Sequence, residues 1–371
     1  AQGNQDSNDI GDFYYTPPNG FLALCSDNLP EPAVTPSEHF NTVLYTGNGS
    51  TQSISNVGFQ PDWVWLKNRT VARNHGTYDA IRGATKDLMP NNGDPETTRS
   101  TGLTAFNSDG FSLSSHSNVN ENTADFVSWN WKANGSGSSN SNGSITSTVS
   151  ANVDSGFSIV SYTGTGSNAT VGHGLSKAPE MMIVKDRDQD MHWLVYHKGL
   201  TNANYFLKMD NTQPQGNDST KWNGTDPTSS VFSIGTEVGV NQSGNNYIGY
   251  MFHSVEGYSR VGEYIGNTTV NTFIWTGFKP AFVLIKNIVT DGEGFVIMNN
   301  KSDPTNVVGT YMMVYQNNAE QGTANTASNR SIDFVSNGFK IRGNSTEIND
   351  SGDKHIYIAF AEQPFKNSNA K

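Results

Sequence analysis

Short stretches of alternating apolar and polar residues recur along the chain, and two of their motifs return three times. The first motif ends a predicted strand in a turn with the pattern Tyr-x-Gly, and it occupies 43–49, 160–166 and 262–267. The second is an apolar run between a proline and a lysine six positions later, and its copies are Pro61 to Lys67, Pro179 to Lys185 and Pro280 to Lys286. A proline at the start of a strand removes no ladder hydrogen bond, so each apolar run predicts a buried strand.

The copies have the size of separate β-sandwiches. Their prolines are spaced by about 100 to 120 residues, well beyond the roughly 20 to 50 residues of a solenoid repeat. Each copy also ends in an aromatic closing strand, and period two places Val127, Trp129 and Trp131 on one face of the first of these. Further strands are predicted at 77–82, 193–197, 205–209, 295–298 and 311–315.

These patterns predict an all-β protein of three tandem jelly-roll or concanavalin-like β-sandwich domains, preceded by a strand segment. A Gly/Ser/Asn-rich stretch indicates a flexible linker between the first two copies. The second and third copies are expected to follow each other almost without a linker. The predicted boundaries are 1–38 for the N-terminal segment, 39–134 for the first repeat, 135–150 for the linker, 151–258 for the second repeat and 259–371 for the third.

Composition narrows the classes of function. Charged residues make up only 15% of the chain, so Asn, Ser, Thr, Gln and Gly must form the polar surface, as suits sheets with many turns. The formal net charge of −11 argues against nucleic acid and anionic membranes as partners, and no apolar stretch predicts membrane insertion. Cys25 is the only cysteine, which excludes an intrachain disulfide.

The repeated motifs resemble an uncharacterised repeat domain of large virion proteins of tailed phages, especially marine ones. The first copy is most similar, in 78–88, 106–111 and 128–133, and the resemblance covers nearly the whole chain. It implies lectin-like β-sandwiches and a place in a virion, and it names no catalytic residues. Residues 10–24 and 28–32 resemble the closing strands of a SPRY-type sandwich that often precedes such repeats, which implies a longer parent polypeptide.

Aromatic residues are the candidates for ligand contacts. The best candidate for an exposed contact is Trp222, because no strand pattern surrounds it, and Tyr78 is the second; either could instead seal a domain junction. Four tryptophans at alternating strand positions could stack on sugar rings, but this pattern more often fills a sandwich core. They are Trp63, Trp65, Trp129 and Trp131.

Motifs for metal binding or catalysis are weak. Residues 186–190 alternate carboxylates as a calcium loop does, yet Met191 stands where an EF-hand has glycine, so a solvated turn is the favoured interpretation. His192 and His197 are expected on opposite faces of a strand and therefore favour structural roles. Carboxylates such as Glu121 with Asp125, or Glu237 with a neighbour, could suggest a glycosidase pair, but any acidic chain offers them. We expect no cofactor, no metal and no enzymatic activity.

The favoured hypothesis is a structural or adhesive segment of a phage virion appendage, either a tail or a head fibre. Its expected partners are copies of itself, with a trimer as one form, other virion proteins and a host-surface glycan, and its expected location is the extracellular virion. Two alternatives stay open: a secreted cellular carbohydrate-binding adhesin and a polysaccharide-degrading virion enzyme.

Overall fold

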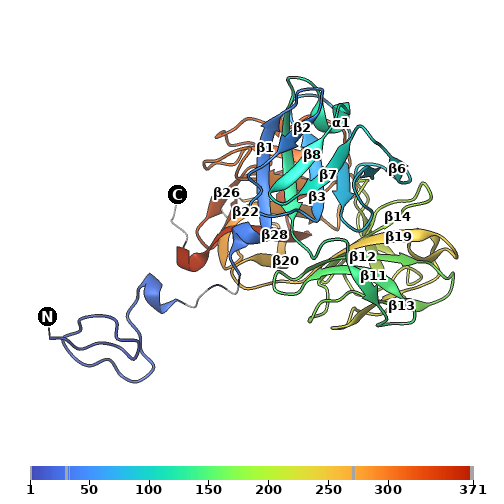
Figure 1. Cartoon of the computed structure of the whole chain (residues 1–371). Coiled ribbons are helices and arrows are strands. Elements are labelled where there is room, and N and C mark those ends of the chain that lie inside the picture. The colour runs from blue at the N-terminus through green and yellow to red at the C-terminus, as the bar shows by residue number, and fades with distance from the viewer. Residues whose placement is uncertain (1, 30–31, 33, 270–271, 368–371) are drawn as a thin grey trace.

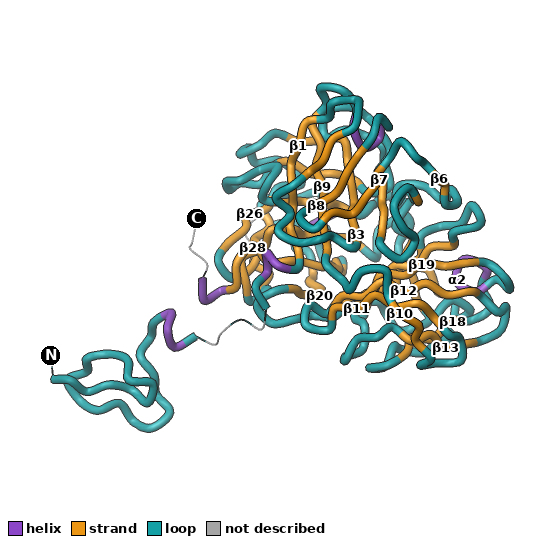
Figure 2. The backbone as a smooth tube through the Cα atoms, in the orientation of Figure 1, coloured by secondary structure: helices purple, strands orange, loops and turns teal. Residues whose placement is uncertain are grey.

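The computed structural model describes residues 2–29, 32, 34–269 and 272–367, and its regular secondary structure consists mainly of antiparallel strands (Figure 1). Loops join the strands, and the α-helices in this part of the chain are single turns (Figure 2). The α-helices are Ser117–Asn120 (α1), Val238–Asn241 (α2) and Thr346–Asn349 (α3), and the 3-10 turns are Ser26–Asn28 (η1), Pro36–Glu38 (η2) and Phe365–Asn367 (η3). The predicted all-β class is confirmed.

The first copy forms a large and a small sheet. Its strands are Phe40–Thr46 (β1), Gln52–Ile54 (β2), Trp63–Asn68 (β3), Gly76–Asp79 (β4), Lys86–Asp87 (β5), Thr97–Thr98 (β6), Leu103–Asn107 (β7), Gly110–Leu113 (β8) and Asp125–Trp131 (β9). The large sheet has the order β1-β9-β3-β4 and the small sheet β2-β8-β7, while β5 pairs with β6.

The second copy repeats this arrangement with further strands at both edges of the large sheet. Its strands are Ser138–Asn140 (β10), Ser147–Asn152 (β11), Phe157–Thr163 (β12), Ala169–Gly172 (β13), Met181–Asp186 (β14), Leu194–His197 (β15), Tyr205–Lys208 (β16), Gly216–Asn217 (β17), Val231–Ile234 (β18) and Asn246–Phe252 (β19). The large sheet has the order β10-β11-β12-β19-β14-β15-β16-β17, and β13 pairs with β18.

The third copy repeats the same order again. Its strands are Ser259–Ile265 (β20), Phe273–Trp275 (β21), Phe278–Asn287 (β22), Val296–Asn299 (β23), Thr310–Met313 (β24), Gln321–Gly322 (β25), Ile332–Val335 (β26), Gly338–Ile341 (β27) and Lys354–Pro364 (β28). The sheets have the orders β20-β28-β22-β23-β24-β25 and β21-β27-β26. In every copy the closing strand (β9, β19 or β28) therefore lies between the strand with the Tyr-x-Gly motif (β1, β12 or β20) and the strand with the proline-to-lysine motif (β3, β14 or β22). The predicted domain boundaries themselves remain a prediction.

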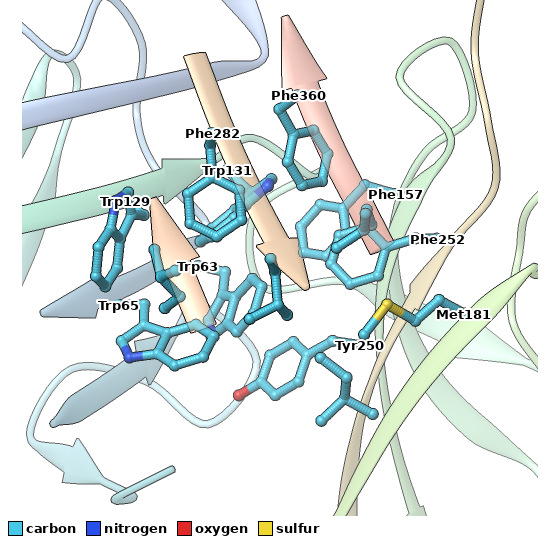
Figure 3. Packing of buried hydrophobic residues seen from close by; sticks show 14 of the residues in the cluster. Trp63, Trp65, Trp129, Trp131, Phe157, Met181, Tyr250, Phe252, Phe282 and Phe360 are labelled. Carbon is cyan, nitrogen blue, oxygen red and sulfur yellow. The ribbon is translucent and has the colours of Figure 1, made fainter. Parts of the chain in front are cut away.

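Both faces of the proline-to-lysine strands are buried, and they face different cores. In β3, Val64 and Leu66 pack in the sandwich of the first copy, whereas Trp63 and Trp65 point to a cluster that contains residues of all three copies (Figure 3). The matching residues in this shared cluster are Met181 and Ile183 of β14, and Phe282 and Leu284 of β22. The large sheets thus pack their outer faces against one another, and the three copies enclose one common core.

Hydrogen bonds at matching positions close the three copies into a ring. The carbonyl two residues after each motif lysine accepts a backbone N–H from a neighbouring copy. The backbone N–H of Glu320 donates to Arg69 O at 3.0 Å, that of Gln215 donates to Ile288 O at 3.0 Å, and that of Glu96 donates to Arg187 O at 2.8 Å. The first copy therefore contacts the third, the third contacts the second and the second contacts the first, which is the closed cyclic contact of a ring oligomer achieved within one chain.

Two of these three contacts between copies, which we call seams, also carry ion pairs. Arg69 Nη2 lies 2.7 Å from Glu320 Oε2, and Arg187 Nε lies 2.9 Å from Glu96 Oε2. The third seam has Ile288 at the equivalent position, and this side chain is buried in the shared core instead. The ring therefore has a repeated backbone plan with different side chains at each seam.

The motif lysines are fully buried and donate to backbone carbonyls. Lys67 Nζ donates to Asn68 O at 3.0 Å, to Arg73 O at 2.9 Å and, across the seam, to Asn317 O at 3.3 Å. Lys286 donates across its own seam to Thr212 O at 3.3 Å. Burial lowers the pKa of Lys67 to about 7 and the pKa of Lys185 and Lys286 to about 8.

The Tyr-x-Gly motif ties the first strand of each copy to its short helix. Tyr45 Oη donates to Val119 O at 2.6 Å, and Tyr162 and Tyr264 make the matching bonds at 2.7 Å in their copies. A Cβ atom on Gly47 would overlap the carbonyl oxygen of Glu121. The motif needs glycine because the backbone of the helix end approaches so closely.

Replacing Gly47 by alanine should lower the free energy of unfolding by about 1 to 3 kcal/mol, because a backbone carbonyl cannot move aside as a flexible side chain can. Urea denaturation measures this loss. The neighbouring exposed residue gives a matched control, and Thr46→Ser, which keeps the hydroxyl that donates to Asp125, should change stability by less than about 0.5 kcal/mol. Equal effects of the two variants would contradict the steric explanation.

The segment predicted as a flexible linker, 135–150, is partly strand. Ser138–Asn140 pairs with β11, and β11 extends the large sheet of the second copy beyond β12. The expectation of a flexible linker is wrong here because the edge of β12 offers free backbone groups, with which a Ser/Asn-rich strand pairs as well as an apolar one does.

The N-terminal segment lies apart from the ring in Figure 1 and contains no regular strand within 2–29. Only one isolated bridge, Asn4 to Phe13, and the η1 turn are present there. Asp6 organises the segment by accepting backbone N–H groups of Asn8, Ile10 and Ala23. The strands expected in the N-terminal segment are therefore absent from 2–29, because an isolated two-stranded hairpin is marginal without a sheet to join.

Candidate functional site

Trp222 and Tyr78, the predicted exposed contacts, are both fully buried. Trp222 packs in the sandwich core of the second copy and Tyr78 in that of the first. The expectation that they are exposed is wrong. Trp222 follows a loop whose turn places the indole inward, 6.3 Å from the ring of Tyr196, so the lack of a strand pattern did not indicate exposure.

The four alternating tryptophans are also buried, in the core shared by the three copies. Trp63 stacks on Trp131 of its own copy and on Tyr250 of the second, with 4.3 Å between ring centroids in both pairs. Trp131 also lies 5.6 Å from Phe360 of the third copy (Figure 3). Core packing is therefore their role, but the core lies between the copies rather than inside the first sandwich.

The calcium-like run begins with a carboxylate that stabilises a turn. Asp186 Oδ1 accepts the N–H groups of Asp188 at 2.8 Å and Gln189 at 3.1 Å. Asn68 and Asn287 make the equivalent turn bonds in the other copies. Within 2–29, 32, 34–269 and 272–367, no group of three or more His, Cys, Asp or Glu residues could hold a metal ion.

The two histidines are not brought together. His192 is half exposed and lies 2.8 Å from Asp210. His197 is buried, and its Nε2 atom lies 3.2 Å from the carbonyl of Tyr357 in the third copy. Burial lowers the pKa of His197 to about 4, so this histidine is neutral at pH 7 and acts as a contact between copies.

The suggested carboxylates have structural partners. Glu121 lies 2.7 Å from Arg73, and Asp125 accepts the hydroxyl of Thr46 at 3.0 Å. Glu237 accepts the N–H of Gly239 at 2.8 Å at the start of α2. None of these contacts forms a groove with two facing carboxylates.

A surface groove of about 540 Å³ lies where the second and third copies meet. Its aromatic wall comes from β21, where Phe273 and Trp275 are 47% and 53% exposed. All seven tryptophans lie in the described part of the chain, and the other six are buried. Trp275 is therefore the one indole available to a ligand.

The groove depends on side chains that only the third copy has on this strand. The matching strands of the three copies are β2, β13 and β21, and one buried residue of each pairs with a buried phenylalanine: Ile54 with Phe111, Val171 with Phe232 and Ile274 with Phe339. The residues on either side of it are Ser53 and Ser55 in the first copy, Thr170 and Gly172 in the second, and Phe273 and Trp275 in the third. The other copies thus carry small or polar groups where the third carries aromatic rings.

The neighbouring strand differs in the same way. Gly262 of β20 pairs with Tyr357 of β28, whereas the matching pair in the first copy is Val43 with Ser128. A Cβ atom on Gly262 would collide with the ring of Tyr357. The glycine therefore leaves room for a large aromatic ring at the base of the groove.

Arg260 joins this aromatic set. Its guanidinium lies 4.5 Å from the centroid of the Trp275 ring, a cation–π distance. Tyr357 Oη donates to the carbonyl of Trp275 at 3.4 Å. Burial raises the pKa of Tyr357, and nearby Arg260 opposes this rise. The groove thus presents a held indole, a permanent cation and a neutral phenol.

Ion pairs surround the groove without filling it. Lys198 lies 2.6 Å from Glu180, and Lys354 lies 3.3 Å from Glu263. Among the described residues, Arg260 forms no ion pair with a carboxylate. Its charge is therefore available to a ligand in the groove.

Sequence reasoning missed Trp275 because a tryptophan at an alternating strand position looks like a core residue. The signal that could have found it is the comparison of the three copies, since aromatic residues replace small or polar ones at both outward positions of the third. To know which positions point outward, the pairing register of β21 with β27 is needed. A strand of three residues is too short for its sequence pattern to indicate that register.

Fold and groove together define an all-β protein of repeated sandwich-type copies with an aromatic surface groove. Residues 35–364 match a domain of unknown function (DUF7483), and the chain belongs to this family. The matched range contains all three copies, in agreement with their common core. No curated protein matches the chain, and no helix in the described part could cross a bilayer.

Proposed function

We propose that the chain is an adhesive structural segment of a phage virion appendage and binds a host-surface glycan in the groove beside Trp275. The observation that carries the glycan part is an exposed indole flanked by Arg260, at a position where the other two copies have small residues. An aromatic face packs against the C–H side of a sugar ring, and charged and hydroxyl groups at its rim bond the sugar hydroxyls.

The place in a virion rests on the resemblance of the repeated motifs to phage virion repeats. Copies of the same chain and other virion proteins are its proposed partners, and the extracellular face of the virion is its proposed location. A rigid ring suits this role, because a binding group on strands of a fixed scaffold needs little ordering when it meets its ligand.

Replacing Trp275 by alanine should weaken glycan binding at least about tenfold, since truncation of a central aromatic contact costs more than about 1.4 kcal/mol. A glycan array identifies the bound sugars, and isothermal titration of a hit with wild type and variant measures the loss. Tyr15→Ala is a matched control, because Tyr15 is an exposed aromatic residue outside the groove, and it should bind as wild type does.

Unchanged binding by the Trp275 variant would move the site elsewhere, and an array without any hit would remove the glycan proposal. The same incubation separates binding from hydrolysis. We expect polysaccharides to keep their length, because Glu263 is the one carboxylate lining the groove and it pairs with Lys354, whereas glycosidases use two facing carboxylates.

A further inference from the structure

Arg260 and Trp275 line two hollows. One is the groove of about 540 Å³, and the other is a second hollow of about 620 Å³. The second hollow extends toward Pro364 and the η3 turn. A ligand that contacts the stacked pair can therefore extend in two directions, as successive units of a polymer do.

Cationic side chains outnumber carboxylates around these hollows. Lys198 and Arg260 line the groove with Glu263, and Lys177, Arg260 and Lys366 line the second hollow with Glu256. Glu180 pairs with Lys198 and Lys354 pairs with Glu263, which leaves Arg260 as the groove cation without an ion pair to a described carboxylate. On a chain with a formal charge of −11, such a cation favours an anionic ligand at this place.

We propose that the groove binds an anionic polysaccharide, with a carboxylate or sulfate of the sugar on Arg260 and a sugar ring against the exposed part of Trp275. This inference rests on the proposed glycan function and adds the chemical class of the sugar. Arg260 suits an oxyanion because its planar guanidinium can donate two parallel hydrogen bonds to it. Stacking on Trp275 keeps the guanidinium plane in place before the ligand arrives.

Polygalacturonate oligomers and the same oligomers after methyl esterification of their carboxyl groups provide a matched pair of probes, and alginate oligomers provide a second uronate. Titration of the full chain should show binding to the acidic forms at least about tenfold tighter than to the ester, a difference of one charge-assisted contact. The preference should shrink as salt is raised, because salt screens exposed charges.

Two variants separate the roles of the stacked pair. Arg260→Gln should bring binding of the acid down to the level of the ester, while Trp275→Ala should weaken both forms. Arg260→Lys should recover part of the preference for the acid, since it restores the charge without the planar fork.

Equal affinity for acid and ester, with loss of both in Trp275→Ala, would overturn the anionic assignment and leave the glycan function standing. Failure of all acidic polymers, with hits among neutral glycans on the array, would do the same. Tighter binding to single-stranded DNA than to any acidic sugar would also overturn the assignment, because it would show a general polyanion site.

Discussion

Replacing Trp131 by alanine should lower the free energy of unfolding by about 3 to 5 kcal/mol, the usual cost of deleting a buried large aromatic side chain. Trp131 contacts Trp63 in its own copy and Phe282 and Phe360 in the third. The cavity would therefore open between copies, and urea denaturation followed by far-UV circular dichroism should show the loss. Hydrogen exchange should speed up in β19 and β28 as well as in β9.

Two controls make this result specific. Trp131→Phe should lower the free energy of unfolding much less, because the closing strands of the other copies have phenylalanine at the matching position. These residues are Phe252 in the second copy and Phe360 in the third. Leu113→Ala makes a cavity inside the first sandwich only, so its effect on exchange should stay mainly in that copy. If Trp131→Ala left the second and third copies unaffected, the common core would not couple them, and three independently folding domains would be the better description.

Replacing Lys67 by methionine should destabilise the protein by about 2 to 4 kcal/mol. Methionine keeps the apolar stem but leaves the carbonyls of Asn68, Arg73 and Asn317 without their donor, and each unsatisfied buried group costs about 1 to 3 kcal/mol. The loss stays below the sum of these costs because the burial of a charged amine is also removed. Urea denaturation measures it, and Lys185→Met, whose amine bonds only carbonyls of its own copy, should loosen the ring less.

The pH dependence of stability gives a second readout of the same lysines. Burial lowers the pKa of Lys67 to about 7 and of Lys185 and Lys286 to about 8. Because the unfolded chain holds these protons up to about pH 10, it binds more protons than the folded state above pH 7, and stability should rise with pH between about 7 and 9. Lys67→Met should reduce this slope, and an unchanged slope would show that Lys67 does not titrate in that range.

Local motifs predicted much of the fold because each has a local physical cause. The predicted strand at 193–197 is β15, Leu194–His197, and the one at 205–209 is β16, Tyr205–Lys208. The Tyr-x-Gly motif marked the end of a strand, since its glycine is required by a close backbone approach. Turn and strand chemistry act over a few residues and can be read directly from them.

The arrangement of the copies could not be predicted in this way. Period two correctly separated Trp63 from Val64, but it does not tell which face packs inside a sandwich and which packs against another copy. The predictions of a flexible linker and of an exposed Trp222 were wrong for related reasons. Composition was interpreted as flexibility, and the absence of a strand pattern was interpreted as exposure. The strand at 138–140 forms by pairing with β11, and Trp222 is buried beside Tyr196, so both outcomes depend on tertiary partners that composition and local pattern do not show.

The difference between the copies bears on how strongly an assembly could attach. A ring made from three identical subunits would present three equal grooves, whereas this single-chain ring carries aromatic residues at the outward positions of only one strand, β21. The proposed glycan site would therefore have a valency set by the number of chains and not by the number of repeats. Avidity would have to come from the packing of many chains on one surface, where linked weak sites gain from a high effective concentration.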